Sequence, residues 1–223
     1  MQTHRSVPRR SPQGGFTLLE ALTAASIFLV VLFGVYVVYD SGEANYSTGK
    51  RKWDVQSQAR VALERLGREI RTAGYAFPAK VTDAVVIATN DTFSFHADLD
   101  GTGPKYVTYS LRDCGGNSGT VLYRNVSTTT FCGGDPFIEG VTSLAFSYYE
   151  LNNVPLPFPA TSTYQLDGQG PITGTGVPST PAAGGQRDRV RQVKIALTVS
   201  QQLKDLVIPF TATTDVALRN LIP

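Results

Sequence analysis

The sequence predicts an α+β fold in which one long helix precedes an antiparallel β-sheet domain. Residues 16–73 are compatible with a helix, first as an unbroken apolar run and then as an apolar stripe spaced three or four residues apart. After Pro78 the apolar spacing changes to two, as half-buried strands require. A chain of 223 residues can bury one sizeable core. We therefore expect a single globular domain with a helical extension.

The first element is an apolar run over residues 16–39, in which Glu20 is the only charged side chain. At about 1.5 Å per residue, a helix of this length crosses a bilayer. His4 and three arginines precede the run, whereas the first charges after it are Asp40 and Glu43. Because basic flanks remain cytoplasmic, the sequence predicts a transmembrane helix with the bulk of the chain exported.

Glu20 is unusual in such a segment. A carboxylate inside a bilayer costs roughly 2.5 to 3.5 kcal/mol on insertion scales and normally needs a partner. The apolar run also lacks the small-x-small cleavage site that ends an ordinary secretory signal. We therefore expect the helix to be retained and Glu20 to have a specific role.

The residues around it resemble the prepilin cleavage motif of type IV pilins and type II secretion pseudopilins, in the order Gly14-Gly15-Phe16-Thr17-Leu18-Leu19-Glu20. The resemblance implies that a prepilin peptidase cuts after Gly15 and methylates the new terminal amine of Phe16. It also implies that Glu20 pairs with the amine of Phe16 in a neighbouring subunit. Each buried charge is unfavourable alone, and the two attract strongly at low dielectric. The alternative is an uncleaved single-pass anchor with an incidental glutamate.

The rest of the helix is predicted from its apolar stripe, with charged pairs on the opposite face. Glu64 with Arg68 and Arg65 with Glu69 have the spacing of surface ion pairs. Gly74 is a plausible C-terminal stop. Three glycines in the helix favour bending or local melting over residues 40–49. The stripe that should face the domain comprises Val55, Ala59, Ala62, Leu66, Ile70 and Ala73.

The remainder is predicted to be β-rich, with Pro209 marking an edge strand or an irregular start. Inward-facing Val193, Ile195, Leu197 and Val199 alternate with more polar residues. Residues 153–187, rich in Pro, Gly, Ser and Thr, are expected to form a long exposed loop. Predicted strands cover residues 81–88, 92–96, 105–112, 120–126, 144–150, 193–199 and 207–218.

Several patches of this part resemble PilW-type minor pilins and J-type pseudopilins: QARVALERLGREIRTAGY, VTSLAFSYYE, VRQVKIALTVS and TDVALRN. The expected organisation is a removed leader over residues 1–15, a helix over 16–74 that spans the membrane at 16–39, and a pilin-like globular domain over 75–223. The resemblance implies a minor type IV pilin that primes or caps a filament. It moves from the inner membrane to the pilus or its tip. Its partners would be other minor and major pilins, the prepilin peptidase and an inner-membrane assembly platform.

Two alternatives remain open. A type II secretion pseudopilin uses the same motif, and a membrane-anchored binding domain working alone would keep its first fifteen residues. No enzyme is expected, because His96 is the only histidine after the leader and is interpreted as a strand residue. The Ser47 and Lys50 pair is interpreted as a coincidence of spacing.

Cys114 and Cys132 are the only cysteines and are flanked by glycines. In an oxidising compartment they are expected to form one disulfide; the alternative is two free thiols of a cytosolic protein.

No cofactor is expected. Asp98 and Asp100 resemble the start of a calcium loop, but an Asp-Gly hairpin turn is the preferred interpretation. Removing three leader arginines and no acid changes the formal net charge from +2 to −1, which disfavours nucleic acid as a partner. A local basic cluster of Arg187, Arg189, Arg191 and Lys194 is the exception, and it is interpreted as a solvated sheet end or a subunit contact.

Overall fold

A computed structural model describes residues 15–75, 84–112, 118–127, 134–157, 166, 185–203 and 206–221. The chain separates into two compact units, Met1–Gly49 and Lys50–Pro223. Each unit is described by itself. Helix α1 (Leu18–Ile70) contributes residues to both units.

In the first unit, the described helical residues are almost all exposed. This part of α1 is long and apolar enough to cross a membrane, and none of its apolar window is buried by the chain. Helical hydrogen bonding continues through residues 40–49, so the local melting expected there is absent from this structure. No described residue outside the helix covers these apolar side chains.

In the second unit, α1 packs its predicted stripe against the sheets. Val55, Ala59, Leu66 and Ile70 are fully buried, and Ala62 is 7% exposed. The helix ends at Ile70, and a turn leads to Gly74, whose φ of +78° favours glycine. Gly74 N then donates to the carbonyl oxygen of His96 at 2.8 Å, which connects the end of the helix to a strand.

The larger sheet is an antiparallel meander in which consecutive strands are neighbours, in the order β1-β2-β3-β4-β5. On its inner face the ring centroid of Phe93 lies 5.6 Å from that of Phe95 and 5.8 Å from that of Phe146, which belongs to the smaller sheet. The strands are β1 (Val85–Ala88), β2 (Thr92–Ala97), β3 (Lys105–Arg112), β4 (Ser118–Ser127) and β5 (Asp135–Glu139).

The smaller sheet has the order β6-β7-β8 and is also antiparallel. Its strands are β6 (Val141–Tyr149), β7 (Gln192–Leu203) and β8 (Leu206–Ala217), with short 3-10 helices η2 (Leu151–Asn153) and η3 (Arg219–Leu221). The predicted inward residues of β7 are fully buried, while Lys194 between them is exposed. The edge position predicted from Pro209 is confirmed, because β8 ends the order of this sheet.

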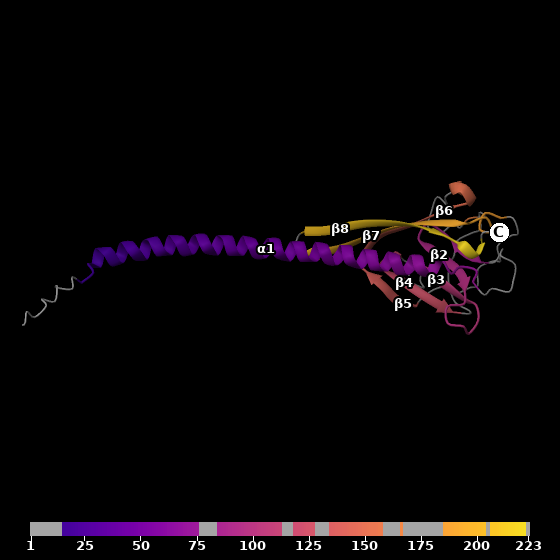
Figure 1. Cartoon of the computed structure of the whole chain (residues 1–223), viewed down its shortest axis with the longest axis horizontal. Coiled ribbons are helices and arrows are strands. Elements are labelled where there is room, and N and C mark those ends of the chain that lie inside the picture. Colours follow the sequence, from indigo (N-terminus) through magenta and orange to yellow (C-terminus); the bar gives the residue numbers. More distant parts are fainter. Residues whose placement is uncertain are drawn as a thin grey trace, which may run out of the picture. The chain divides into compact units, whose positions relative to one another are not determined.

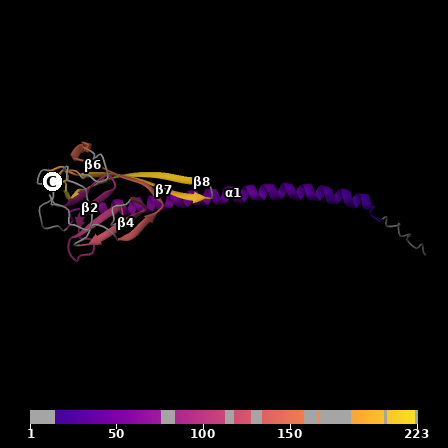
Figure 2. The same cartoon turned by 180° about the vertical axis from the view of Figure 1, so that it is seen from behind.

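Helix α1 runs between the two sheets in the second unit. Figures 1 and 2 show β7 and β8 on one side of α1 and β4 and β5 on the other. One large apolar cluster joins the helix stripe to both sheets. The structure thus confirms the α+β prediction of a long helix on antiparallel sheets.

The predicted strands are found, with shifted ends, and β5 was missed. Five residues with a central proline, DPFIE, gave too short a pattern to recognise. Of the loop expected over residues 153–187, only 153–157, 166 and 185–187 lie within the described residues.

Candidate functional site

The helix begins directly after the predicted cleavage site, with a built-in N-terminal cap. Glu20 N donates to Thr17 Oγ1 at 3.3 Å, and Ala21 N donates to the Thr17 carbonyl oxygen at 3.1 Å. Thr17 is therefore the N-cap residue, and Glu20 occupies the third helical position, as in a capping box. A carboxylate in the first turn is also favoured by the helix dipole. The capping box and the helix dipole thus both favour a glutamate at position 20.

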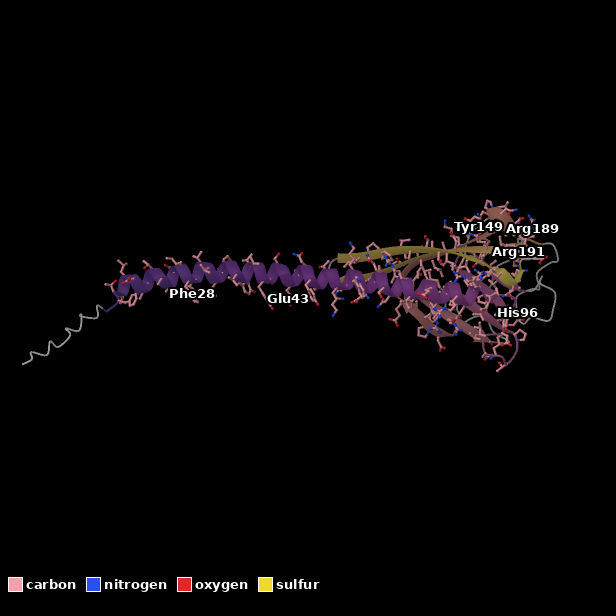
Figure 3. All side chains as sticks on the ribbon, viewed as in Figure 1. Phe28, Glu43, His96, Tyr149, Arg189 and Arg191 are labelled. Carbon is pink, nitrogen blue, oxygen red and sulfur yellow. The ribbon has the colours of Figure 1, made fainter. Side chains whose placement is uncertain are left out.

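The side chains around this start are exposed. Phe16 is 85% exposed and Leu19 72%, and Figure 3 shows Phe28 pointing away from the helix. Such an apolar surface is far more than an isolated soluble helix tolerates. It requires lipid or other protein around it.

Gly15 has no structural requirement within the chain. A Cβ built on Gly15 meets no atom within 4 Å. As far as the described residues are concerned, a larger side chain would fit at this position.

A comparison with protein-family models agrees with this geometry. Residues 10–36 match the model described as the prokaryotic N-terminal methylation motif. The matched segment contains the Gly15–Phe16 bond and the capped first turn with Glu20. The methylation motif supports a type IV pilin-like or pseudopilin precursor, and no curated protein matches the chain.

In the second unit, a polar cluster fixes α1 to the larger sheet. Glu69 Oε2 accepts a hydrogen bond from Tyr109 Oη at 2.6 Å and an ion-paired one from Arg124 Nε at 2.7 Å. Its Oε1 accepts from Arg65 Nε at 3.4 Å, and the Arg65 guanidinium lies 5.2 Å from the centroid of the Phe137 ring. We call these five residues the Glu69 cluster. It connects α1, β3, β4 and β5.

The environment of the Glu69 cluster raises the pKa values of Tyr109 and Arg124. Burial, followed by the hydrogen bond to Glu69, raises the pKa of Tyr109 far above its ordinary value of 10.0. Burial alone would lower the pKa of Arg124, but the hydrogen bond and charge of Glu69 raise it above the ordinary value. Tyr109 therefore stays neutral and Arg124 stays charged, as the geometry requires.

The calcium candidates lie in the turn between β2 and β3. Asp98 Oδ1 accepts from Gly101 N at 2.7 Å, and Asp100 Oδ2 accepts from Lys105 Nζ at 2.6 Å. The hydrogen bond from Lys105 is the main reason that the pKa of Asp100 lies well below its ordinary value. Both carboxylates thus serve the turn between the strands. Among the described residues, no group of three or more His, Cys, Asp or Glu side chains has the geometry of a metal site.

The basic cluster near residue 190 does not form one exposed patch. Arg187 is buried and donates to the carbonyl oxygen of Val86, and Arg189 pairs with Glu150. Arg191 donates to the Asp188 carbonyl oxygen at 2.5 Å. Figure 3 shows Arg189 and Arg191 near the β6 end of the domain. Arg187 has a core position that its neighbours in sequence do not share.

Of the remaining candidate residues, the structure describes His96, Ser47 and Lys50. His96 lies in β2, as predicted, with its ring centroid 4.1 Å from that of Tyr106. Ser47 and Lys50 are helical residues of α1, and Ser47 Oγ donates to the Ala44 carbonyl oxygen at 2.9 Å. Cys114 and Cys132 lie outside the described residues.

Two features were missed by sequence reasoning. The Thr17-x-x-Glu20 spacing is a capping-box signal and was available from the sequence alone. Nothing in the sequence predicted the contacts of Glu69 with Tyr109 and Arg124, because these partners lie 40 and 55 positions after it in the chain.

Proposed function

We propose that the chain is a minor type IV pilin, a structural subunit that helps to prime or cap a pilus filament. It waits in the inner membrane with its C-terminal domain exported. A prepilin peptidase cuts after Gly15 and methylates Phe16, and the subunit then joins other minor and major pilins through an assembly platform.

The observation that carries this proposal is Glu20 in the first turn of an exposed apolar helix, five residues after Gly15. A cut at Gly15 creates a cationic amine on Phe16. The pair of this amine with Glu20 of a neighbouring subunit would compensate both buried charges. Lipid and a neighbouring helix are equally apolar, so packing and this pairing must supply the net stabilisation of assembly.

The first test is the mass of the native N-terminus. Mass spectrometry of the chain isolated from membranes should find residues 16–223, with one added methyl group on Phe16. A Gly15→Val variant should remain uncut although it folds, because the chain leaves room for a side chain at this position. Recovery of an uncut, unmethylated wild-type chain would remove the basis of the proposal.

The second test separates charge from helix capping at Glu20. Glu20→Gln keeps a capping-box residue but removes the charge, so the variant should enter the membrane and yet be absent from sheared filaments. Thr17→Ala is the matched control, because it removes the cap and leaves the charge. Normal assembly of Glu20→Gln would contradict the pairing mechanism.

The second candidate is a type II secretion pseudopilin, since the methylation motif is common to both classes. Deletion of the encoding gene separates them. Loss of pili and twitching supports the minor pilin, whereas loss of exoprotein secretion with normal pili supports the pseudopilin. A domain that works alone in the membrane predicts neither defect.

A further inference from the structure

Each sheet in the second unit presents one free edge beside α1. Strand β5 ends the larger sheet, and β8 ends the smaller one. A groove of about 840 Å³ lies between α1, the β5 edge and the end of β7, lined by residues that include Val61, Glu139 and Gln201. A groove of about 460 Å³ lies between α1 and the β8 edge, lined by residues that include Arg60, Arg71 and Thr213. Free edges are templates for pairing with another strand.

The unpaired charged residues that line the two grooves are opposite in sign. Arg60 and Arg71 are exposed beside β8, and Asp135 and Glu139 are exposed on β5. Across the described parts of the chain, none of these four side chains has an ion-pair partner. Each groove also has one lining residue of the other sign among the described residues, and both are paired: Glu64 in the β8 groove with Arg68 at 3.0 Å, and Arg65 in the β5 groove with Glu69 at 3.4 Å. One edge therefore offers unpaired carboxylates and the other unpaired guanidinium groups.

The two edge strands also run in opposite directions. Strand β5 leads to Gly140, whose carbonyl oxygen accepts from Ser200 N at 2.8 Å. Ser200 pairs with Pro209 near the start of β8. Strand β5 therefore ends where β8 begins, as their arrows show in Figure 1. Two copies with parallel α1 segments can thus place β5 of one antiparallel to β8 of the other.

The charges lie at matching levels along α1. Glu139 shares its groove with Ser57 and Val61, which flank Arg60 in the helix. Asp135 lies opposite Arg124 in the β4–β5 register, and Arg124 binds Glu69, two residues before Arg71. Asp135 and Glu139 are about 13 Å apart along a strand, and Arg60 and Arg71 are about 16 Å apart along the helix. Long arginine side chains can span this difference.

We propose that the β5 edge of one copy docks against the β8 edge and the Arg60–Arg71 face of a second copy, head to tail, while both are held in the membrane. The pairs are Glu139 with Arg60 and Asp135 with Arg71. The proposal rests on the membrane anchorage in the proposed function, because anchorage in one membrane gathers copies of the chain on one surface. Strand β5 has only five residues and includes Pro136, which has no backbone N–H. Few backbone hydrogen bonds can therefore join β5 to β8, and the two ion pairs decide whether the contact forms.

Pairing of β8 with β8 of a second copy fits less well. It would bring two sets of arginines together, Arg60 and Arg71 of each copy. The head-to-tail contact avoids this conflict and leaves a free edge at each end for further subunits.

Site-specific cross-linking of the full chain in native membranes tests the contact. Thr213, exposed on β8, is replaced by the photoreactive residue p-benzoylphenylalanine in cells that express two differently tagged copies. Irradiation should give an adduct that contains both tags, attached within residues 135–139 of the second copy. The same replacement at exposed Leu151, in η2, is the control and should not react with residues 135–139.

Charge reversal provides the decisive comparison. Arg60→Glu should lower the adduct yield at least fivefold, and adding Glu139→Arg should restore it to within twofold of the wild type. Arg51→Glu, at an exposed helix position outside the grooves, should leave the yield unchanged. Raising salt to 0.5 M should reduce the wild-type yield, since exposed charges are screened.

The outcomes separate this contact from the proposed function. Glu20→Gln should keep the adduct although it does not enter filaments, because the contact forms before assembly. An adduct absent from a cut and membrane-inserted wild-type chain, an adduct that maps elsewhere, or a failure of Glu139→Arg to restore the yield would overturn the contact. An uncut chain that still gives the adduct would overturn the pilin proposal alone.

Discussion

Glu20 and Glu69 lie on the same helix in opposite settings. Glu20 is exposed in the first turn and has a backbone cap beside it, whereas the Glu69 side chain is 15% exposed and binds two groups on the larger sheet. An exposed carboxylate costs the isolated chain little, so its role must be sought outside the chain. A largely buried carboxylate with charged partners stabilises the fold itself.

Removal of the Glu69 charge should therefore destabilise the globular unit. Glu69→Gln leaves Arg124 without its counter-charge and should lower the free energy of unfolding by about 2 to 3 kcal/mol. The matched control is Glu64→Gln, which breaks the exposed pair with Arg68 and should cost less than about 0.5 kcal/mol. Urea unfolding of residues 50–223 measures both. Equal effects would show that the Glu69 cluster contributes nothing beyond a surface pair.

Alkaline pH should also destabilise the fold. Burial raises the pKa of Tyr109 and of Tyr148 far above 10.0, so both keep their protons in the folded state. The unfolded chain loses these protons near pH 10, so stability is complete below that pH and falls above it. The slope should be about 1.4 kcal/mol per pH unit for each tyrosine.

The variant that tests this pH dependence is Tyr109→Phe, which should remove about half of the slope. Tyr75→Phe, at a residue 58% exposed, should leave the slope unchanged. The free energy of unfolding measured from pH 9 to 11.5 gives both values. An unchanged slope in Tyr109→Phe would contradict the assignment.

At the scale of elements, two sequence patterns predict α1, and the two parts of the helix that they describe have different packing partners. The stripe from Val55 to Ile70 packs on sheets of the same chain. The apolar run before residue 40 is covered by nothing in the chain. A single helix therefore provides both a core face and a surface that needs lipid or other subunits.

The core face can be tested at one position. Leu66 is fully buried, so Leu66→Ala should lower the free energy of unfolding by about 2 to 5 kcal/mol. Val61 on the same helix is 62% exposed, and Val61→Ala should change it by less than about 0.5 kcal/mol. Urea unfolding of residues 50–223 checks the contrast. A small loss for Leu66→Ala would mean that the helix does not pack on the sheets in solution.

The link between the sheets depends on Gly140. Its φ is +73°, and a Cβ there would lie 2.7 Å from the Ser200 carbonyl oxygen. Gly140→Ala should therefore cost more than about 1 kcal/mol, because the clash is with backbone and the conformation is strained. Gly119→Ala, where the nearest atom is 3.8 Å away, is the control. Similar thermal midpoints for the two variants would contradict this reason.

At the scale of the whole molecule, the two units meet different requirements. Every member of the main core cluster lies within residues 50–223, so this unit has a core of its own. None of the described residues of the first unit belongs to this cluster, so cover for their apolar side chains must come from lipid or another molecule. Folding of the second unit, by contrast, is a property of the chain itself.

The predicted disulfide belongs to this scale, because a bond between Cys114 and Cys132 would close a loop of the globular domain. If Cys114 and Cys132 are bonded, the native chain should resist alkylation until it is reduced, and its mass should then rise by two alkyl groups. Reduction should lower the free energy of unfolding by about 3 kcal/mol on the chain-entropy model. Immediate alkylation of both thiols in the exported protein would refute the bond.

Much of the fold follows from local patterns, and the exceptions have physical causes. Three features are visible in the sequence: the apolar stripe of α1, the alternation of β7 and the edge position indicated by Pro209. Each depends on the spacing of nearby side chains or on the missing N–H of proline, which are local properties. Strand β5 was not visible in the sequence, because five residues are too few to show an alternation of apolar and polar side chains. The core position of Arg187 was not visible either, because its chain neighbours suggested a basic surface cluster.

By itself, the sequence determined the methylation motif, the capped start of an apolar helix, the face of α1 that is buried and the β character of the domain. Each of these depends on residues within a few positions of one another. Only the tertiary structure decided that Glu69 joins Tyr109 and Arg124, and that unpaired acids and arginines flank α1 at opposite sheet edges. Those groups are far apart in the chain, and only the packing of the strands around the helix brings them to their positions.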